Sequence, residues 1–407
     1  MPSAATLPAL SRPGNRGGAR LVRLPRRRRH ATPPVPCSGA DSGARIAIVS
    51  AGIGGGHNAC ADELGRRLRA SGFTVDTYDF MDQFPGRTGA LLRRLYAGQL
   101  SVLPASWGVL CTLLRARPVC WLVAVLCTLL TGRALRRRTA GAAAVLSTYP
   151  LATLVLGRMR RRGRLARRRR LTAPVLTYLT DVSVHPLWME RGCDCYLAAH
   201  RITAEQITAL GARRVRRVDA AVRSQFRSGP QQSQAAARRR LGLPVTGRLA
   251  LVAGGAWAVG DVARTAREIA ATGTAVPVVV CATNEALRAE LAAAGVGITL
   301  GWVDEMATLM RACDAVVTNG GGITSVEATE LGVPVLIHRP LPGHGRTNAE
   351  AFDAAGLAYW VRDGNELAAA LHEPRRPATE PAKADPATVV AELAAVAAPA
   401  PALRRIA

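Results

Sequence analysis

Lysine is almost absent from this chain of 407 residues, since Lys383 is the only one. Arginine therefore carries the formal net charge of +26. A charge of this sign and size favours an anionic partner, either nucleic acid or a membrane surface. Aromatic residues are also scarce, at 4% of the chain, and single-stranded nucleic acid needs aromatic side chains on which its bases stack. We therefore expect an anionic membrane surface and no nucleic acid as partner.

Paired cysteine motifs are absent as well. The nine cysteines are scattered, and the two closest, Cys193 and Cys195, are separated by a single residue. This spacing excludes the paired CxxC sets of zinc sites and the CxxC redox motif. The sequence therefore predicts a chain with reduced thiols in the cytoplasm.

The two ends of the chain differ in composition from its centre. Residues 1–44 are rich in Pro, Gly and Ser, and they contain an arginine run at 26–29 but no acidic residue before Asp41. They predict a disordered basic arm, although a transit peptide, or residues upstream of the true start, would have the same composition. Residues 366–407 are rich in Ala and Pro and predict a weakly structured tail.

Between the ends, short apolar runs alternate with helical patterns, as in a parallel sheet covered by helices. The strands expected from these runs lie at 45–50, 73–80, 144–147, 175–179, 196–199, 215–218, 249–252, 276–281, 298–300, 315–317 and 333–337. We predict an α/β fold with two Rossmann-like domains, at 45–226 and 245–365, that face each other across a cleft. A linker at 227–244 begins with a polar stretch containing Gly229 and Pro230.

Three consecutive glycines, Gly320–Gly322, separate the apolar run 315–317 from a helical pattern that opens at Thr324. Glycines let a ligand approach the backbone, and the free N–H groups of a helix start favour a phosphate. Glu327 could instead complete a capping box with Thr324, which needs no ligand. The position of the glycines at the carboxyl end of a strand favours a ligand site.

A second glycine-rich loop, residues 52–56, follows the first strand and ends at His57. It is not a P-loop, because no Lys-Ser/Thr follows, and its contiguous glycines do not fit the dinucleotide pattern. A lone histidine is most often a polar surface residue. At the top of a strand, with an ordinary pKa of about 6.5, His57 could accept a proton from a hydroxyl group. Asp181 follows the strand at 175–179 and belongs to the same edge; with His185 it could form a metal pair, but no further ligand is evident.

Residues 91–135 predict helices with long apolar faces, interrupted by arginines. The longest apolar run, Val119–Thr131, is shorter than the roughly 20 residues that a spanning helix needs. The helices could simply pack on the domain, or they could lie on a bilayer with arginines on lipid phosphates. A second basic run at 158–170 favours the bilayer. We predict peripheral attachment to the inner face of the plasma membrane.

Taken together and in this order, the motifs resemble those of the GT-B glycosyltransferases of the monogalactosyldiacylglycerol synthase and processive diacylglycerol glycosyltransferase group, which is glycosyltransferase family 28-like. The resemblance extends over about residues 45–363. It rests on Ser50–Ala59, Thr180–Asp181, His185–Trp188, Gly254–Gly255, Thr318–Glu327 and Pro342–Asn348.

This resemblance implies a UDP-sugar-dependent hexosyltransferase whose C-terminal half binds the donor and whose N-terminal half binds a lipid acceptor such as diacylglycerol. The implied catalytic residues are His57, as the base, and Asp181. The implied donor-binding residues, with Glu327 at the ribose and Val303 at the uracil, are Gly254, Gly255, Val303, Gly320, Gly321, Gly322, Ile323, Thr324, Glu327, His344, Asn348 and Arg223. The implied acceptor-binding residues are Gly55, Gly56, His185 and Trp188.

No cofactor and no metal are expected, because helix N-termini and an arginine, Arg223, would stabilise the leaving UDP. The chain also has no Asp-x-Asp motif. One departure concerns the sugar: relatives usually carry Gln or Glu in the turn before Asn348, whereas this chain has His344-Gly345-Arg346. The identity of the sugar therefore stays open.

Three alternatives also stay open. A UDP-sugar epimerase shares the fold but would not need the apolar helices or a base in the first loop. A non-catalytic, membrane-associated nucleotide-sugar-binding protein would carry the same motifs. A nucleic-acid-binding protein would explain the charge but not the glycine loops.

Overall fold

A computed structural model gives the structure of residues 43–53, 55–102, 104–161, 171–227, 232–255, 258–381 and 383–397. The basic arm predicted at 1–44 lies almost wholly outside these residues. Residues 162–170 of the basic run at 158–170 and the Gly229–Pro230 pair of the linker also lie outside them.

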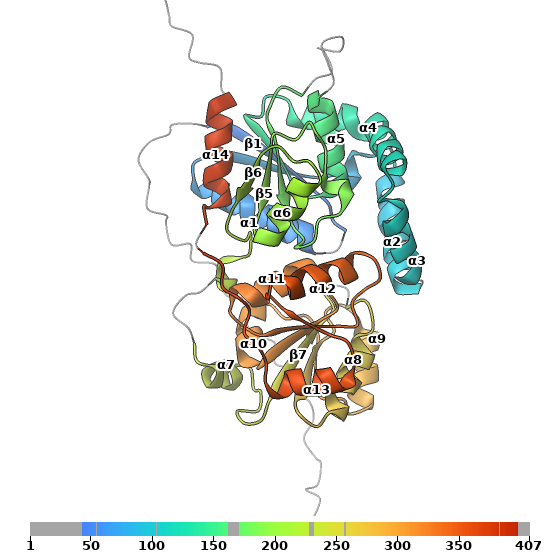
Figure 1. Cartoon of the computed structure of the whole chain (residues 1–407), viewed down its shortest axis with the longest axis vertical. Helices are drawn as coiled ribbons and strands as arrows, with labels where there is room; N and C mark the ends of the chain where they lie inside the picture. The colour runs from blue at the N-terminus through green and yellow to red at the C-terminus, as the bar shows by residue number, and fades with distance from the viewer. Residues whose placement is uncertain are drawn as a thin grey trace, which may run out of the picture. The chain divides into compact units, whose positions relative to one another are not determined.

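The described strands form two parallel sheets of six strands each (Figure 1). The first has the order β2-β1-β3-β4-β5-β6. Its strands are β1 (Arg45–Ser50), β2 (Thr74–Asp79), β3 (Ala144–Ser147), β4 (Val175–Leu179), β5 (Cys195–Ala198) and β6 (Val215–Arg217). The second has the order β12-β11-β10-β7-β8-β9. Its strands are β7 (Leu249–Ala253), β8 (Val276–Val280), β9 (Ile298–Leu300), β10 (Ala315–Thr318), β11 (Val335–His338) and β12 (Tyr359–Val361).

Helices connect the strands and cover both faces of each sheet. The first half contains α1 (Gly56–Ala70), α2 (Thr88–Val102), α3 (Pro104–Leu113), α4 (Arg117–Thr139), α5 (Pro150–Arg161) and α6 (Arg201–Ala209). The rest of the chain contains α7 (Gln234–Arg240), α8 (Val262–Ala271), α9 (Glu285–Ala293), α10 (Met306–Ala312), α11 (Gly322–Glu330), α12 (His344–Ala354), α13 (Gly364–His372) and α14 (Pro386–Ala397). Every residue of β3, β4, β7 and β10 is buried. Helices cover both faces of these strands, which explains why their sequences are continuous apolar runs. The prediction of an α/β fold with two Rossmann-like domains is confirmed.

The tail is better ordered than its composition suggests, and the prediction of a weakly structured tail is wrong for residues 366–372, which belong to α13. It is also wrong for residues 386–397. These residues form α14, which begins with Pro386 at a position where the missing N–H costs nothing. Val389 and Val390 are fully buried and join the core of the first sheet together with Leu64 of α1. Short side chains such as Ala and Val can be fully buried in a helix when the surface that they pack against lies close.

The apolar faces predicted at 91–135 occur as α2, α3 and α4, which Figure 1 shows at one side of the first sheet. Eleven of the fifteen large apolar side chains that the structure shows as exposed lie on these three helices. They are Leu91, Leu92, Leu95, Val109, Leu110, Leu113, Trp121, Leu122, Leu126, Leu129 and Leu130. Exposed apolar side chains in this number on three consecutive helices are typical of an interaction site. We call it the α2–α4 apolar surface.

Helix α4 is longer than the apolar run within it. It has 23 residues, and its most apolar stretch of 18 residues has a mean hydropathy of 1.7. By length and composition alone α4 could cross a membrane. The run Val119–Thr131 therefore underestimated the apolar length of this helix. Its opposite face, however, is buried in the first domain through Cys127, Thr131 and Leu135. A helix with one face in a folded core has only the other face available to lipid.

Candidate active site

The loop between β1 and α1 is held by polar contacts at the carboxyl edge of the first sheet. Ser50 Oγ donates to Asn58 Oδ1 at 2.7 Å, and the Gly52 N–H donates to Asp79 Oδ2 at 2.7 Å. Gly55 is exposed. A Cβ on Gly56 would lie 3.4 Å from Ile323 Cγ2. The start of α1 therefore lies against α11 of the second half, at a distance that leaves room for a methyl group on Gly56.

His57 is the second residue of α1, and its neutral ring has a defined tautomer. Its Nδ1 lies 2.8 Å from the Thr148 carbonyl oxygen, and a carbonyl can only accept, so Nδ1 carries the hydrogen. The neutral ring then has a lone pair on Nε2, which makes that atom a proton acceptor. Burial lowers the pKa of His57 below its usual 6.5, although the Asp181 carboxylate partly offsets this effect. His57 therefore stays neutral, as a base must, at neutral pH.

Asn348 connects Asp181 to the glycine turn of the second sheet. Its Nδ2 lies 3.3 Å from Asp181 Oδ1 and 3.2 Å from the Gly320 carbonyl oxygen. Its Oδ1 accepts from the N–H and the hydroxyl of Ser183 at 3.0 and 2.7 Å. Asn348 is fully buried, so these hydrogen bonds use its full donor and acceptor capacity in a dry environment. The loop after β4 and the turn after β10 are thereby held together.

Glycine is required at two positions of the turn between β10 and α11. Gly320 has φ +82°, and a Cβ there would lie 2.4 Å from the Gly345 carbonyl oxygen. A Cβ on Gly322 would lie 2.5 Å from Asp181 Oδ1. Helix α11 therefore begins directly against Asp181, with Ile323 and Thr324 in its first turn.

The capping-box alternative for Glu327 is wrong. Helix α11 begins at Gly322, two residues before Thr324, and its N-cap residue, Gly321, makes no side-chain capping bond. The first N–H groups of α11 therefore have no side-chain cap, and such groups form a ready site for an anion.

Glu327 faces an arginine instead. Its Oε1 lies 3.4 Å from Arg223 Nη2, and burial raises the pKa of Glu327 to about 7 even though Arg223 opposes this shift. The Glu327 side chain is 8% exposed, whereas that of Arg223 is 52% exposed. A carboxyl group held at this depth can accept hydrogen bonds from ligand hydroxyls. Arg223 pairs with Glu327 and lies 4.9 Å above the centroid of the Phe226 ring, but its side chain is exposed enough to be reached by an anion.

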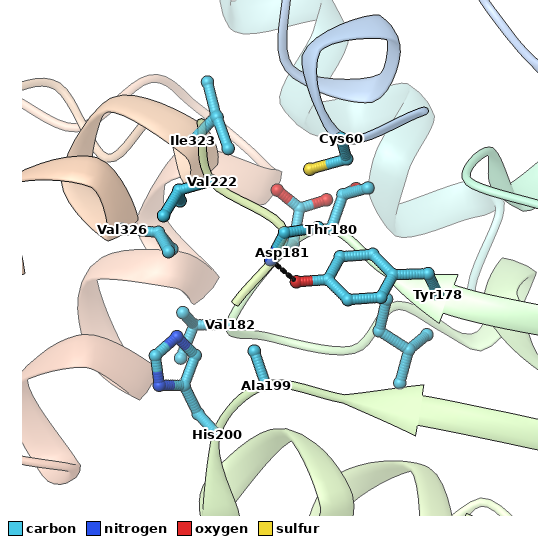
Figure 2. Close-up of a pocket in the computed structure, with 12 residues that line it drawn as sticks. Cys60, Tyr178, Thr180, Asp181, Val182, Ala199, His200, Val222, Ile323 and Val326 are labelled. Atoms are coloured by element: carbon cyan, nitrogen blue, oxygen red, sulfur yellow. Dashed lines mark hydrogen bonds between the residues drawn. The ribbon is translucent and has the colours of Figure 1, made fainter. Parts of the chain in front are cut away.

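A small pocket opens beside Asp181 between the two halves of the site (Figure 2). The space between its lining atoms amounts to about 250 Å³ when open solvent is included, but the cavity itself, at about 10 Å³, has room for only about one water molecule. Helix α1 contributes Cys60, helix α11 contributes Ile323 and Val326, and Figure 2 shows Asp181 close to Cys60. The walls are mostly apolar, and the hydroxyl of Tyr178 is occupied by the N–H of Ala221 at 2.7 Å. Asp181 is therefore the acidic group of this wall.

Not every residue predicted for the site has a free functional group. His185 Nε2 donates to the Cys111 carbonyl oxygen at 3.0 Å, and its Nδ1 accepts from the Leu187 N–H at 3.2 Å. Both ring nitrogens are occupied, and the described residues contain no cluster of three metal-binding side chains around the His185–Asp181 pair. Trp188 is 2% exposed and lies behind the His57 ring, at 6.2 Å between centroids. It can support His57 from this position.

The remaining donor residues lie at the carboxyl edge of the second sheet. Gly254 and Gly255 follow β7, which pairs with β10, and a Cβ on Gly254 would lie 2.6 Å from Val262 Cγ2. Val303 follows β9, two strands beyond β7 in the sheet, and packs against its core. His344 begins α12 one turn before Asn348, and its Nδ1 accepts from the indole N–H of Trp107 at 2.8 Å.

Comparison with known proteins bears on this arrangement. No family model matches the chain. The processive diacylglycerol beta-glucosyltransferase of Bacillus cereus is 29% identical over 210 residues, which are 48% of this chain and 52% of that protein. The enzyme of the same name from Bacillus subtilis is 28% identical over 231 residues, 55% of this chain and 58% of that protein.

The predicted resemblance to the diacylglycerol glycosyltransferases is confirmed. The chain spans about half the length of the curated relatives that it matches. A solved structure, the glycotransferase of kitacinnamycin, aligns with 87% of this chain and 93% of its own, at a TM-score of 0.52 and 17% identity. This likeness confirms the predicted GT-B fold.

Sequence reasoning missed the residues that hold the site together. Thr148, Ser183 and Trp107 orient His57, Asn348 and His344 respectively, yet none belongs to a glycine loop or an acidic motif. Trp107 is 237 residues away from His344 along the chain. Only the spatial neighbourhood reveals these partners.

Proposed function

We propose that the chain is a UDP-sugar-dependent glycosyltransferase that moves a hexose to a membrane lipid acceptor such as diacylglycerol. One observation carries the proposal: Asn348 fixes Asp181 against the turn that begins α11, on the side of the molecule where His57 offers a free Nε2. A proton acceptor and an anion-binding helix start then face one reaction site. The names of the sequence relatives support this choice of donor and acceptor class.

In the proposed reaction the acceptor hydroxyl gives its proton to His57 Nε2 while its oxygen bonds to the anomeric carbon of the sugar. The bond from that carbon to the UDP oxygen breaks, and the electron pair leaves with UDP. Negative charge then grows on the terminal phosphate, where the first N–H groups of α11 and the Arg223 guanidinium stabilise it. The ionised Asp181 stabilises the imidazolium that forms on His57.

The glycine turn Gly320–Gly322 would hold the diphosphate and Glu327 the ribose hydroxyls. We propose no metal cofactor, since α11 and Arg223 supply positive charge at the leaving group. The α2–α4 apolar surface would rest on the lipid, with exposed arginines such as Arg115, Arg117 and Arg133 near its phosphates. We propose a peripheral location on the inner face of the plasma membrane.

The test is UDP release from a panel of UDP-hexoses, with and without diacylglycerol in anionic vesicles. Release that requires both one sugar and the lipid supports the proposal and names the donor. Release that is unaffected by diacylglycerol, or sugar interconversion without UDP release, contradicts it and favours another acceptor or an epimerase. Absence of UDP binding would contradict the role given to the glycine turn.

A further inference from the structure

Helix α3, whose outer face belongs to the α2–α4 apolar surface, contacts the donor half of the site through its inner face. The Nε1 of Trp107 lies 2.8 Å from His344 Nδ1, and the two rings meet edge to face at 6.1 Å between centroids. His344 and Asn348 are four residues apart on α12, so they share one face of that helix. This face is the one directed at Asp181 and the Gly320 turn.

The contact defines the tautomer of His344. An indole nitrogen is a donor only, so the imidazole Nδ1 must accept and the ring hydrogen must sit on Nε2. Protonation of the ring would place two N–H groups opposite each other and break the bond. Burial also lowers the pKa of His344 below its usual value, which keeps the ring neutral. His344 thus offers Nε2–H as a donor, the opposite of the Nε2 acceptor on His57.

The backbone around His344 is packed against α3 as well. Gly343 has φ +78°, and a Cβ there would lie 2.9 Å from Cys111 Sγ and 3.3 Å from Gly108 Cα. Trp107 is itself held edge to face by Tyr96 of α2, at 4.9 Å between centroids. The indole of Trp107 is therefore held in place and can fix the orientation of the His344 imidazole.

Gly345, the residue after His344, has no space for a side chain. A Cβ there would lie 2.9 Å from Leu341 Cβ and 3.1 Å from the Asn319 carbonyl oxygen. A polar side chain that reaches the sugar cannot come from this position. At the first position of α12, the imidazole of His344 can supply such a donor.

We propose that Trp107 is a positioning residue for the donor sugar, because it holds His344 with Nε2–H directed at a sugar hydroxyl oxygen. This inference rests on the proposed function and deepens it. A single fixed donor discriminates between hexoses by the position of one hydroxyl group, since a misplaced hydroxyl leaves a buried N–H unpaired.

The test is Trp107→Phe, which keeps an aromatic ring and removes the N–H group. We expect the KM for the preferred UDP-hexose to rise about tenfold, the effect of one hydrogen bond of about 1.4 kcal/mol. The preference between hexoses should fall in parallel, and the affinity for UDP without a sugar should stay unchanged. Trp360→Phe, in β12 of the second sheet, is the matched control and should change none of these quantities.

Histidine ¹⁵N NMR gives a second, independent measurement. The wild-type His344 ring should show the Nε2–H tautomer, and Trp107→Phe should show a mixture of tautomers. An Nδ1–H tautomer in the wild type, or equal losses of UDP and UDP-hexose affinity in Trp107→Phe, would overturn the inference. The spectrum reports the tautomer whether or not a donor binds, whereas failure of the proposed function would appear as absence of UDP binding by the wild type.

Discussion

Three neutral histidines with different hydrogen-bond states surround the proposed reaction site. His57 presents an acceptor nitrogen, His344 presents a donor nitrogen, and His185 has both nitrogens occupied. Burial lowers the pKa of all three. Residue type alone could not distinguish these roles, because the partner of each ring nitrogen decides which tautomer is present.

His57→Ala should lower kcat for transfer by about 10² to 10⁴-fold, the usual contribution of a general base. The affinity for UDP should not change, because His57 belongs to the domain that we propose for the acceptor. Steady-state kinetics with calorimetric UDP titration measures both quantities. Loss of UDP binding in this variant would place His57 on the donor instead.

The wild-type pH profile follows from the same residue. His57 must be neutral to accept a proton, and its pKa lies below 6.5. The acid limb of kcat/KM should therefore fall below pH 6.5, with activity sustained above it. An acid limb centred well above pH 6.5 would argue against His57 as the base.

Glu327 links protonation to stability. Its pKa is raised to about 7, so the folded state binds more protons than the unfolded state between the ordinary carboxyl pKa and pH 7. The free energy of unfolding should thus decrease as pH rises through this window. Glu327→Gln should remove this dependence. The free energy of unfolding of the variant, relative to that of the wild type, should therefore rise by about 2 kcal/mol from pH 5 to pH 8.

Urea unfolding at the two pH values measures this difference. The same variant should bind UDP-sugar more weakly by about 1–3 kcal/mol if Glu327 holds the ribose. An equal difference in the free energy of unfolding between variant and wild type at both pH values would show that the carboxyl group does not titrate in this window. Unchanged donor affinity would remove Glu327 from the site.

At the scale of elements, we expect the close approach of α11 to Asp181 to be sensitive to mutation. Gly322→Ala would place a methyl group 2.5 Å from Asp181 Oδ1, so the helix or the carboxylate must move. A displacement of about 1 Å in such a site can lower activity by about 10²-fold. Gly364→Ala, at the start of α13, is the control, because no atom lies within 4 Å of an added Cβ. Equal activities of the two variants would contradict the geometry of the turn.

Substitutions on the α2–α4 apolar surface should weaken binding to lipid vesicles. Leu126 and Leu129 are 54% and 68% exposed on α4. Leu126→Asp/Leu129→Asp should weaken vesicle binding at least tenfold, since each leucine loses about 1.5–3 kcal/mol of burial in lipid. The melting temperature should change little. Leu210→Asp, at a 39% exposed leucine after α6, is the control, and equal vesicle binding by both variants would remove the surface from the membrane contact.

Across the whole molecule, the two sheets could be predicted from the sequence, whereas the ordered part of the tail could not. Continuous apolar runs such as Ala315–Val317 identify buried parallel strands, and the glycines after them mark the edge where ligands bind. The Ala-rich segment 386–397 has no such signal, because its burial depends on the surface of α1. Contacts between distant segments, such as Asn348 with Ser183, escape any pattern of neighbouring residues.

Helix α14 should therefore contribute to the stability of the first domain. Val390→Ala removes fully buried methyl groups and should lower the free energy of unfolding by about 2 kcal/mol, from lost burial and the cavity left behind. Thr388→Ala, at an exposed position of the same helix, should have a much smaller effect. Equal unfolding midpoints in urea would mean that α14 does not belong to the folded core.

The most direct test of the central claim is the mass of the lipid after reaction. Wild-type protein should convert diacylglycerol in anionic vesicles into a glycolipid one hexose unit heavier, in the presence of one UDP-hexose. His57→Ala should bind UDP equally well and yield no such lipid. If wild-type protein binds UDP yet forms no glycolipid with any UDP-hexose, this chain does not transfer hexose to diacylglycerol.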